Sequence, residues 1–278
     1  MHAQQILWAA LAALSHASPI QNADTTPTFN ISTNSTRAII PLPSPLHLPQ
    51  IKTTNDQLHL SSLPFGVSIT HCTVPGTIAL TFDDGPFIYT SQMLDTLAIH
   101  GARATFFLNG QNKGYIYAFP ELVQRIVSEG HQLGSHTWNH LPLDTLPYAD
   151  IVRQMTALEE AFLQILGFIP TYMRAPYLYM NAVVLQAMAD LGYHVIGASI
   201  DTKDYENDDP GMSWRSFEKF KFELDAGGNV VLAHDSHENT VAVLVDNILE
   251  EVERRGLSPV TIGECLGDPP ELWYRLGR

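Results

Sequence analysis

The stretch TIALTFDDGP occupies residues 77–86 and decides the fold. Residues 77–82 form a short run rich in apolar and β-forming side chains, which is typical of a buried strand. Two carboxylates, Asp83 and Asp84, follow directly, and the Gly85-Pro86 pair after them predicts a turn. The stretch therefore predicts a buried strand that ends in paired acidic residues.

Strand-like and helix-like segments alternate from this stretch to residue 262. Asp150 is expected to cap the longest helix, whose buried stripe begins at Ile151. About seven βα units predict a parallel sheet, closed as a barrel or doubly wound. The expected strands are residues 77–82, 104–108, 131–134, 172–174, 193–200, 229–233 and 259–262. The expected helices are residues 91–100, 120–129, 150–165, 181–191, 213–224 and 241–255.

Polar clusters follow five of the expected strands. Because the carboxyl ends of parallel strands meet on one face, where active sites form, we expect these clusters to lie together. An Asx-type turn would explain the glycine and proline of the first cluster, but not five clusters at five strand ends. The clusters are residues 83–84, 136–140, 174–177, 201–205 and 234–235.

His136 and His140 are candidate metal ligands. Two histidines four residues apart can bind one metal, although exposed histidines at this spacing are also common. Asp83 or Asp84 offers the third ligand, and the other carboxylate would then contact the bound water. A site with two histidines, one carboxylate and an open position activates water for hydrolysis.

Two further side chains allow a structural and a functional interpretation. His234 ends an apolar strand, where a lone histidine is usually a hydrogen-bonded core residue, but beside an activated water it could serve as a general acid. Arg174 could be a structural ion-pair partner, or it could keep a carboxylate ionised in an acidic pocket.

Composition limits the function further. The 278 residues are 45% hydrophobic and carry a net charge of −14, which disfavours binding to nucleic acid and to anionic membranes. No run of 18 apolar residues occurs after the first twenty, so no later segment is expected to span a bilayer.

The N-terminal part is typical of an exported protein. Residues 6–14 are apolar and a small-residue cleavage site ends at Ala17, so residues 1–17 predict a signal peptide, with a short buried helix as the alternative. Asn30 and Asn34 lie in glycosylation sequons. Residues 18–69 predict a disordered linker or propeptide rich in Pro, Ser and Thr, and residues 70–278 a catalytic domain.

The chain has two cysteines, Cys72 and Cys265. In an oxidising compartment they can pair, and the alternative is two buried free thiols.

Five motifs of the chain, in their order, resemble those of the polysaccharide deacetylases, carbohydrate esterase family 4. Residues 192–207 and 226–240 are similar to the fungal chitin deacetylase branch. The resemblance covers residues 70–262. The motifs are residues 81–86 (TFDDGP), 135–140 (SHTWNH), 174–177 (RAPY), 201–205 (DTKDY) and 232–234 (LAH).

This resemblance implies a distorted (β/α) barrel. Together with the predicted signal peptide, it leads us to expect a secreted, extracellular or cell-wall enzyme. The implied reaction removes N-acetyl groups from chitin or chitooligosaccharides and yields acetate and chitosan. By the family pattern, Asp84, His136 and His140 hold a divalent metal, usually Zn²⁺, with Co²⁺ or another divalent ion possible. We expect the protein to be a monomer.

The family pattern also assigns the remaining residues. Asp83 would be the general base and Arg174 would orient it, while His234 would protonate the departing amine and Asp204 would orient His234 and raise its pKa. The backbone N–H of Tyr177 would stabilise the oxyanion. Tyr205, which replaces a tryptophan of many members, and Leu232 would line the acetyl pocket and groove.

Two alternatives remain at this stage. The motifs indicate that an acetyl group is removed, but they do not identify the polysaccharide that carries it. Peptidoglycan or xylan could therefore be the substrate. A catalytically inactive carbohydrate-binding protein is the second alternative, although every catalytic position is filled.

Overall fold

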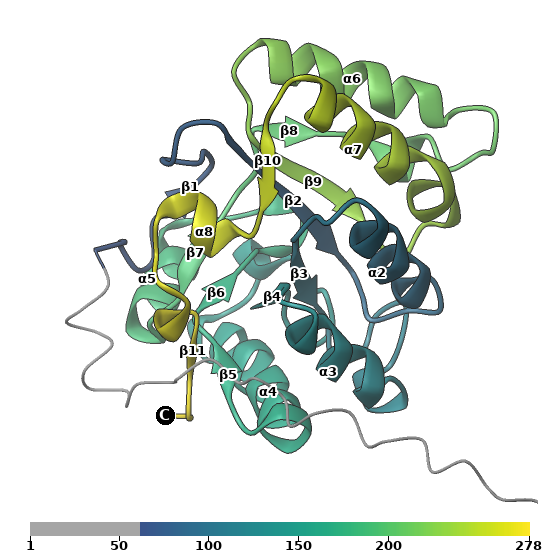
Figure 1. The fold of residues 1–278 in the computed structure, drawn as a ribbon. Helices are drawn as coiled ribbons and strands as arrows, with labels where there is room; N and C mark the ends of the chain where they lie inside the picture. The colour runs from purple at the N-terminus through teal and green to yellow at the C-terminus, as the bar shows by residue number, and fades with distance from the viewer. Residues whose placement is uncertain (1–61) are drawn as a thin grey trace, which may run out of the picture. The chain divides into compact units, whose positions relative to one another are not determined.

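The structure, a computed structural model, describes residues 62–278 (Figure 1). The predicted signal peptide, the two sequons at Asn30 and Asn34, and most of the predicted linker lie outside the described residues. The first described strand, β1, begins at Ser68, two residues before the predicted start of the catalytic domain at Thr70.

A parallel sheet forms the centre of the described residues. Its strands run in the order β1-β7-β6-β4-β3-β2-β9-β8, with β10 pairing beside β2, and every pairing is parallel. The distorted (β/α) barrel is thereby confirmed, with nine strands rather than about seven. The strands are β1 (Ser68–Ile69), β2 (Thr77–Asp83), β3 (Thr105–Leu108), β4 (Gln132–Ser135), β6 (Tyr172–Met173), β7 (His194–Ile196), β8 (Ile200–Asp201), β9 (Val230–His234) and β10 (Ser258–Val260).

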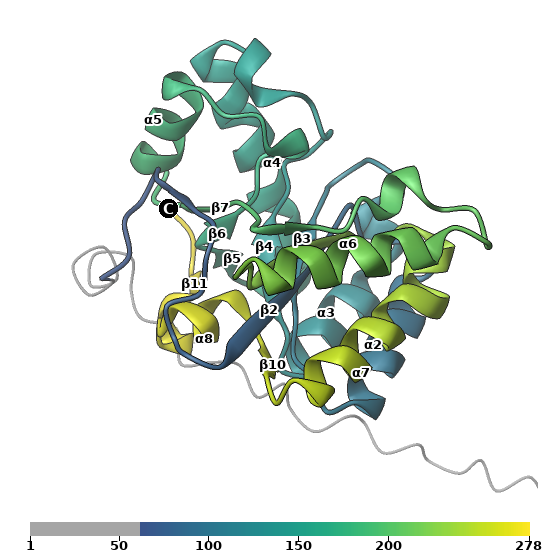
Figure 2. The same ribbon diagram turned by 90° about the horizontal axis from the view of Figure 1, so that it is seen from above.

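Helices connect the strands and lie outside the sheet, as Figures 1 and 2 show from two directions. Local sequence signals place them: Pro120 opens α3, and the Asn181 side chain accepts hydrogen bonds from two backbone N–H groups at the start of α5. The helices are α2 (Thr90–Ile99), α3 (Pro120–Ser128), α4 (Tyr148–Leu166), α5 (Ala182–Asp190), α6 (Ser213–Asp225), α7 (Val245–Arg254) and α8 (Ile262–Leu266).

The single strand predicted at residues 193–200 is wrong. The segment forms two strands, β7 and β8, which pair near opposite edges of the sheet. Gly197 N donates to Ile69 O and Ser199 N donates to Val230 O, so residues 197–199 cross from one edge to the other. A Cβ on Gly197 would lie 2.9 Å from Cγ2 of Thr70, so the close approach of β1 favours glycine at this break.

The predicted cap of the longest helix is also wrong. Helix α4 begins at Tyr148 with Pro147 at its N-cap, and the Asp150 N–H already donates to the carbonyl of Pro147. Asp150 therefore lies inside the first turn, where an acidic side chain favours the positive end of the helix dipole.

Three short elements were not predicted from the sequence. Strands β5 (Ile169–Pro170) and β11 (Tyr274–Arg275) form a separate antiparallel pair. Helix α8 begins with a capping box in which Thr261 and Glu264 each bond the other's backbone N–H.

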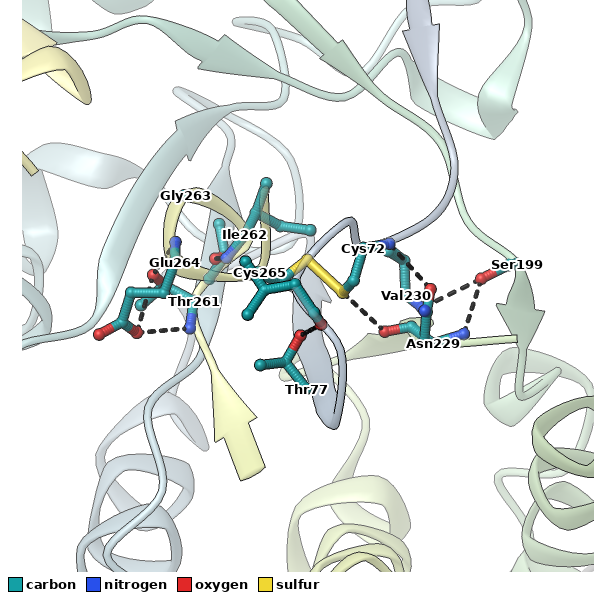
Figure 3. The surroundings of a disulfide bond; sticks show 12 residues. Cys72, Thr77, Ser199, Asn229, Val230, Thr261, Ile262, Gly263, Glu264 and Cys265 are labelled. Carbon is teal, nitrogen blue, oxygen red and sulfur yellow. Dashed lines mark hydrogen bonds between the residues drawn. A yellow bond between two sulfur atoms is a disulfide. The ribbon is translucent and has the colours of Figure 1, made fainter. Parts of the chain in front are cut away.

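The predicted pairing of the two cysteines is confirmed. A disulfide joins Cys72, in the segment after β1, to the fully buried Cys265 of α8 and closes a loop with a sequence separation of 193 residues (Figure 3). Beside it, the Asn229 side chain accepts a hydrogen bond from the backbone N–H of Cys72 over 2.9 Å.

Among residues 62–278, no helix combines the length and the apolar character that a bilayer crossing requires.

Candidate active site

Polar residues from the carboxyl ends of the strands surround one cavity of about 660 Å³, here called the cleft. The predicted clusters from β2, β4, β6, β8 and β9 all contribute to it, either as lining or directly behind it. The cleft is lined by Asp83, Asp84, Asn112, Lys113, His136, His140, Tyr177, Leu178, Tyr179, Asp201, Lys203, Tyr205, Glu206, Leu232, His234 and His237.

Three of these side chains converge as a metal site requires. Asp84 Oδ1 lies 3.2 Å from His140 Nε2 and 3.8 Å from His136 Nε2, and all three ligand atoms lie within 4.8 Å of one another. Ligands about 2.1 Å from a tetrahedral ion are separated by about 3.4 Å, so these distances fit a zinc-sized cation. The structure thus selects Asp84, rather than Asp83, as the carboxylate of this group.

Burial and hydrogen bonding prepare the two histidines as neutral ligands. Burial lowers the pKa of His136 to about 3 and also lowers the pKa of His140. Nδ1 of His136 bonds the carbonyl oxygen of Arg174 over 2.8 Å, so Nδ1 carries the proton and Nε2 presents its lone pair to the site.

A left-handed turn directs the carboxylate of Asp84. Its φ is 76°, and Nδ2 of Asn112 donates to Asp84 Oδ1 over 2.9 Å. Asn109 supports the segment that carries the histidines, because its side chain donates to the carbonyls of His136 and Thr137. Neither asparagine was predicted as a site residue, although residues 109–112 follow the end of β3 just as the other polar clusters follow their strands.

Asp83 lies beside this group, 3% exposed, with its Oδ2 atom 3.7 Å from His136 Nε2. Burial raises the pKa of Asp83, and the charge of Arg174 offsets part of that rise. The fully buried Arg174 donates from Nη1 to Asp83 Oδ1 over 2.9 Å and from Nη2 to the carbonyl of Gly197 over 2.8 Å. The predicted contact between Arg174 and a carboxylate is therefore present, and it also ties Asp83 to the break between β7 and β8.

His234 and Asp204 form a second charged pair across the cleft. His234 Nδ1 lies 2.8 Å from Asp204 Oδ1, and Asp204 Oδ2 accepts bonds from the backbone N–H of His234 and from the Thr240 hydroxyl. Burial alone would lower the pKa of His234, but the charge and hydrogen bond of Asp204, together with the charges of Asp83 and Asp84, raise the pKa to about 9. His234 is consequently protonated at neutral pH and can donate a proton.

The predicted substrate-contacting residues Tyr177, Tyr205 and Leu232 all line the cleft. The ring of Tyr177 packs edge-on against His140, and the ring of Tyr205 packs edge-on against His234. Lys203 lies over the Tyr205 ring and bonds its hydroxyl. His237 Nδ1 lies 2.9 Å from Asp208 Oδ2, and His237 also lines the cleft.

One cavity brings together three features: two neutral histidines with one aspartate, a second buried carboxylate, and a protonated histidine. This combination is typical of a metal-dependent hydrolase. The comparisons with known proteins agree with this class. A family model for polysaccharide deacetylase matches residues 70–196. The chain belongs to the polysaccharide deacetylase family and is a hydrolytic deacetylase.

Relatives of this family match the chain over most of the described residues. A chitin deacetylase of Pestalotiopsis sp is 54% identical over 78% of this chain and 72% of its own length. A probable peptidoglycan-N-acetylglucosamine deacetylase of Arthroderma benhamiae is 51% identical over 77% of this chain and 49% of its own length. The solved chitin deacetylase of Colletotrichum lindemuthianum matches with a TM-score of 0.76 and 46% identity, covering 78% of this chain and 98% of that one.

Proposed function

We propose that this protein is a secreted, metal-dependent chitin deacetylase, which hydrolyses N-acetyl groups of N-acetylglucosamine units and yields acetate and chitosan. The observation that carries the proposal is the convergence of Asp84, His136 and His140 beside Asp83 and opposite His234 in one cleft. The relatives named chitin deacetylase support the substrate class.

Asp84, His136 and His140 are the residues that would hold the metal, and we propose zinc. The donor set of two neutral imidazoles and one carboxylate oxygen suits zinc and leaves a coordination position open. When bound, the ion would act as a Lewis acid that polarises the acetamide carbonyl and lowers the pKa of water.

Asp83 is the proposed general base, which takes a proton from the attacking water. Its Oδ1 atom is occupied by Arg174, so Oδ2 is the atom directed toward the metal-binding histidines and available to the water. Arg174 is the proposed positioning residue for this base, because its guanidinium holds one carboxylate oxygen while bonding the main chain on its other side.

His234 is the proposed general acid. With Nδ1 held by Asp204, its Nε2 atom is the one free to give a proton to the departing amine. The negative charge of Asp204 keeps the imidazole protonated until that step. The backbone N–H of Tyr177 is the proposed oxyanion donor, and the left-handed turn at Tyr177, with φ at 59°, sets the direction of the main chain there.

The wall of the cleft suits a neutral sugar chain. Tyr177, Tyr179 and Tyr205 are each between 41% and 56% exposed, so their rings are available to stack on the apolar faces of sugar rings. Leu232 supplies an apolar side chain beside His234, where the acetyl methyl would lie.

Secretion and the domain limits form part of the same proposal. A disulfide persists in an oxidising compartment, which agrees with export. We propose residues 1–17 as the signal peptide, residues 18–69 as the linker and residues 70–278 as the catalytic domain, acting as a monomer on chitin.

Mass spectrometry of defined acetylated chitooligosaccharides tests the proposal. Each deacetylation removes one acetyl group, so we expect products that are lighter by successive acetyl groups, together with acetate. A chelator should stop the reaction and added zinc should restore it. Oligomers of unchanged mass after incubation with the zinc-loaded protein would contradict the proposal.

Peptidoglycan is the second candidate substrate, because a relative with 51% identity is named as a probable peptidoglycan-N-acetylglucosamine deacetylase. A parallel incubation with peptidoglycan fragments separates the two candidates. A higher kcat/KM on chitooligosaccharides is the expected result, and the reverse order would assign peptidoglycan as the substrate.

A further inference from the structure

Asp235 is a buried carboxyl group that the proposed reaction does not use. It follows His234 at the end of β9, it is 0% exposed, and it does not line the cleft. Its Oδ2 atom accepts a hydrogen bond from the Thr90 hydroxyl over 2.5 Å, whereas Oδ1 has no hydrogen-bond partner within residues 62–278. Burying a carboxyl with so few partners costs free energy, so its location calls for a compensating role.

The carboxyl packs against the turn that carries the metal ligand Asp84. A Cβ built on Gly85 would lie 2.5 Å from Oδ2 and 2.7 Å from Oδ1 of Asp235, so the carboxyl touches the main chain of Gly85 itself. On the other side, the Gly85 carbonyl accepts a bond from Asn109 N over 2.8 Å. The turn is therefore held between β3 and β9.

Thr90 extends this support to the next residues of the turn. Its hydroxyl accepts a hydrogen bond from Phe87 N over 2.9 Å while donating to Asp235, and its own N–H donates to the Phe87 carbonyl. Asp235 thus contacts the turn directly at Gly85 and, through Thr90, at Phe87.

Asp84 needs such support because its backbone is left-handed, with φ at 76°. This conformation is unfavourable for a residue other than glycine and must be maintained by its surroundings. Without the contacts to Gly85 and Phe87, the turn can relax and move the Asp84 carboxylate away from His136 and His140.

We propose that Asp235 is a positioning residue, which acts through Thr90 and the main chain of Gly85 to hold Asp84 in the geometry that binds the metal. This inference rests on the proposed metal site. It predicts that Asp235 and Thr90 affect metal affinity as one unit, although neither is a ligand.

Zinc affinity, measured by competition with a chromophoric chelator, tests the inference. We expect Asp235→Ala and Thr90→Val each to weaken zinc binding by about 10-fold or more, the range found for residues behind metal ligands. Because the two residues share the bond between the Thr90 hydroxyl and Asp235, the loss of zinc affinity in the double variant should be smaller than the sum of the two single losses, expressed as free energies. Thr90→Ser keeps the hydroxyl and should restore the affinity of the unsubstituted protein.

Asp268 provides the matched control. It is 4% exposed, accepts a hydrogen bond from the Tyr172 hydroxyl over 2.7 Å, and does not line the cleft. Asp268→Ala should lower the thermal midpoint and leave zinc affinity unchanged. For Asp235→Ala, excess zinc should restore kcat and leave KM unaltered. If the substitution only destabilised the fold, excess zinc would not restore kcat.

Two results would overturn the inference, and only the second is also a failure of the proposed metal site. Unchanged zinc affinity in Asp235→Ala and Thr90→Val would contradict a positioning role while leaving the proposed function intact. Should Asp235→Ala fail to fold, Thr90→Val decides alone. If the unsubstituted protein binds no zinc, the zinc site itself is contradicted, and the inference with it.

Discussion

Nδ1 of His136 bonds the carbonyl oxygen of Arg174 over 2.8 Å, although 38 residues separate the two along the chain. The same arginine holds Asp83 with its guanidinium. One residue therefore orients a candidate metal ligand through its main chain and the candidate base through its side chain. Arg174 is fully buried, so surrounding side chains hold it in place and both bonds keep their geometry.

Replacement of Arg174 should affect stability and activity together. Arg174→Ala leaves Asp83 buried without its cation, so we expect the free energy of unfolding to fall by about 3–5 kcal/mol. Urea denaturation measures this. Arg103→Ala is the control, since it removes a partly exposed ion pair with Glu264, which should cost about 1 kcal/mol or less. Equal losses in the two variants would contradict the role given to Arg174.

The exchange Asp83→Asn separates proton transfer from metal binding. It keeps the size of the side chain but removes the base, so kcat should fall by about 10²–10⁴-fold. Zinc affinity should stay near that of the unsubstituted protein, whereas His136→Ala should lose zinc. Acetate release and chelator competition provide the two measurements, and full activity in Asp83→Asn would refute the base assignment.

The pH dependence of kcat/KM reports on His234. A general acid acts while protonated, so activity should persist up to about pH 9, the raised pKa of His234, and decline above it. Asp204→Asn removes the charge that raises this pKa, and the alkaline limb should move down by about 1–3 pH units. Asp246→Asn, which alters the exposed pair with His100, should leave the limb in place. An unmoved limb in Asp204→Asn would argue against His234 as the acid.

The same pair should contribute a pH-dependent part of stability. The pKa of His234 is higher in the folded chain than the ordinary value of 6.5, so folding favours its protonated form. Its contribution is complete below about pH 6.5 and should be lost as the pH rises through about 9. Denaturant midpoints across this range, compared between the unsubstituted protein and Asp204→Asn, measure the effect; a parallel decline in both would contradict it.

Removal of the disulfide should destabilise the described domain. Closing a loop with a separation of 193 residues stabilises a chain by about 5 kcal/mol at most in the loop-entropy model. We expect Cys72→Ser with Cys265→Ser to lose a large part of this, and reduction of the unsubstituted protein to produce a similar loss. A midpoint that changes in neither case would show that the bond contributes nothing.

Long periodic segments of the fold were predictable from the sequence, because their patterns are set by burial. Strand β2 and helix α5 lie within one residue of the predicted bounds. The break at Gly197 was not predictable, because it depends on β1 approaching from a distant part of the chain. Strands β5 and β11 have two residues each and are too short to show a period.

The site was predictable where its residues follow strand ends in recognisable motifs, as Asp84, His136 and His140 do. The choice between Asp83 and Asp84 as ligand required either the family pattern or the structure, since adjacent residues share the same strand end. Asn112 and Asp235 act through contacts between distant segments, and such contacts leave no local pattern.

Anomalous X-ray diffraction at the zinc edge, from crystals grown with zinc, tests the central claim most directly. The account predicts one strong peak at about 2.1 Å from an Asp84 carboxylate oxygen and from Nε2 of both His136 and His140. A peak held by other residues, or no peak in the cleft at saturating zinc, would contradict it.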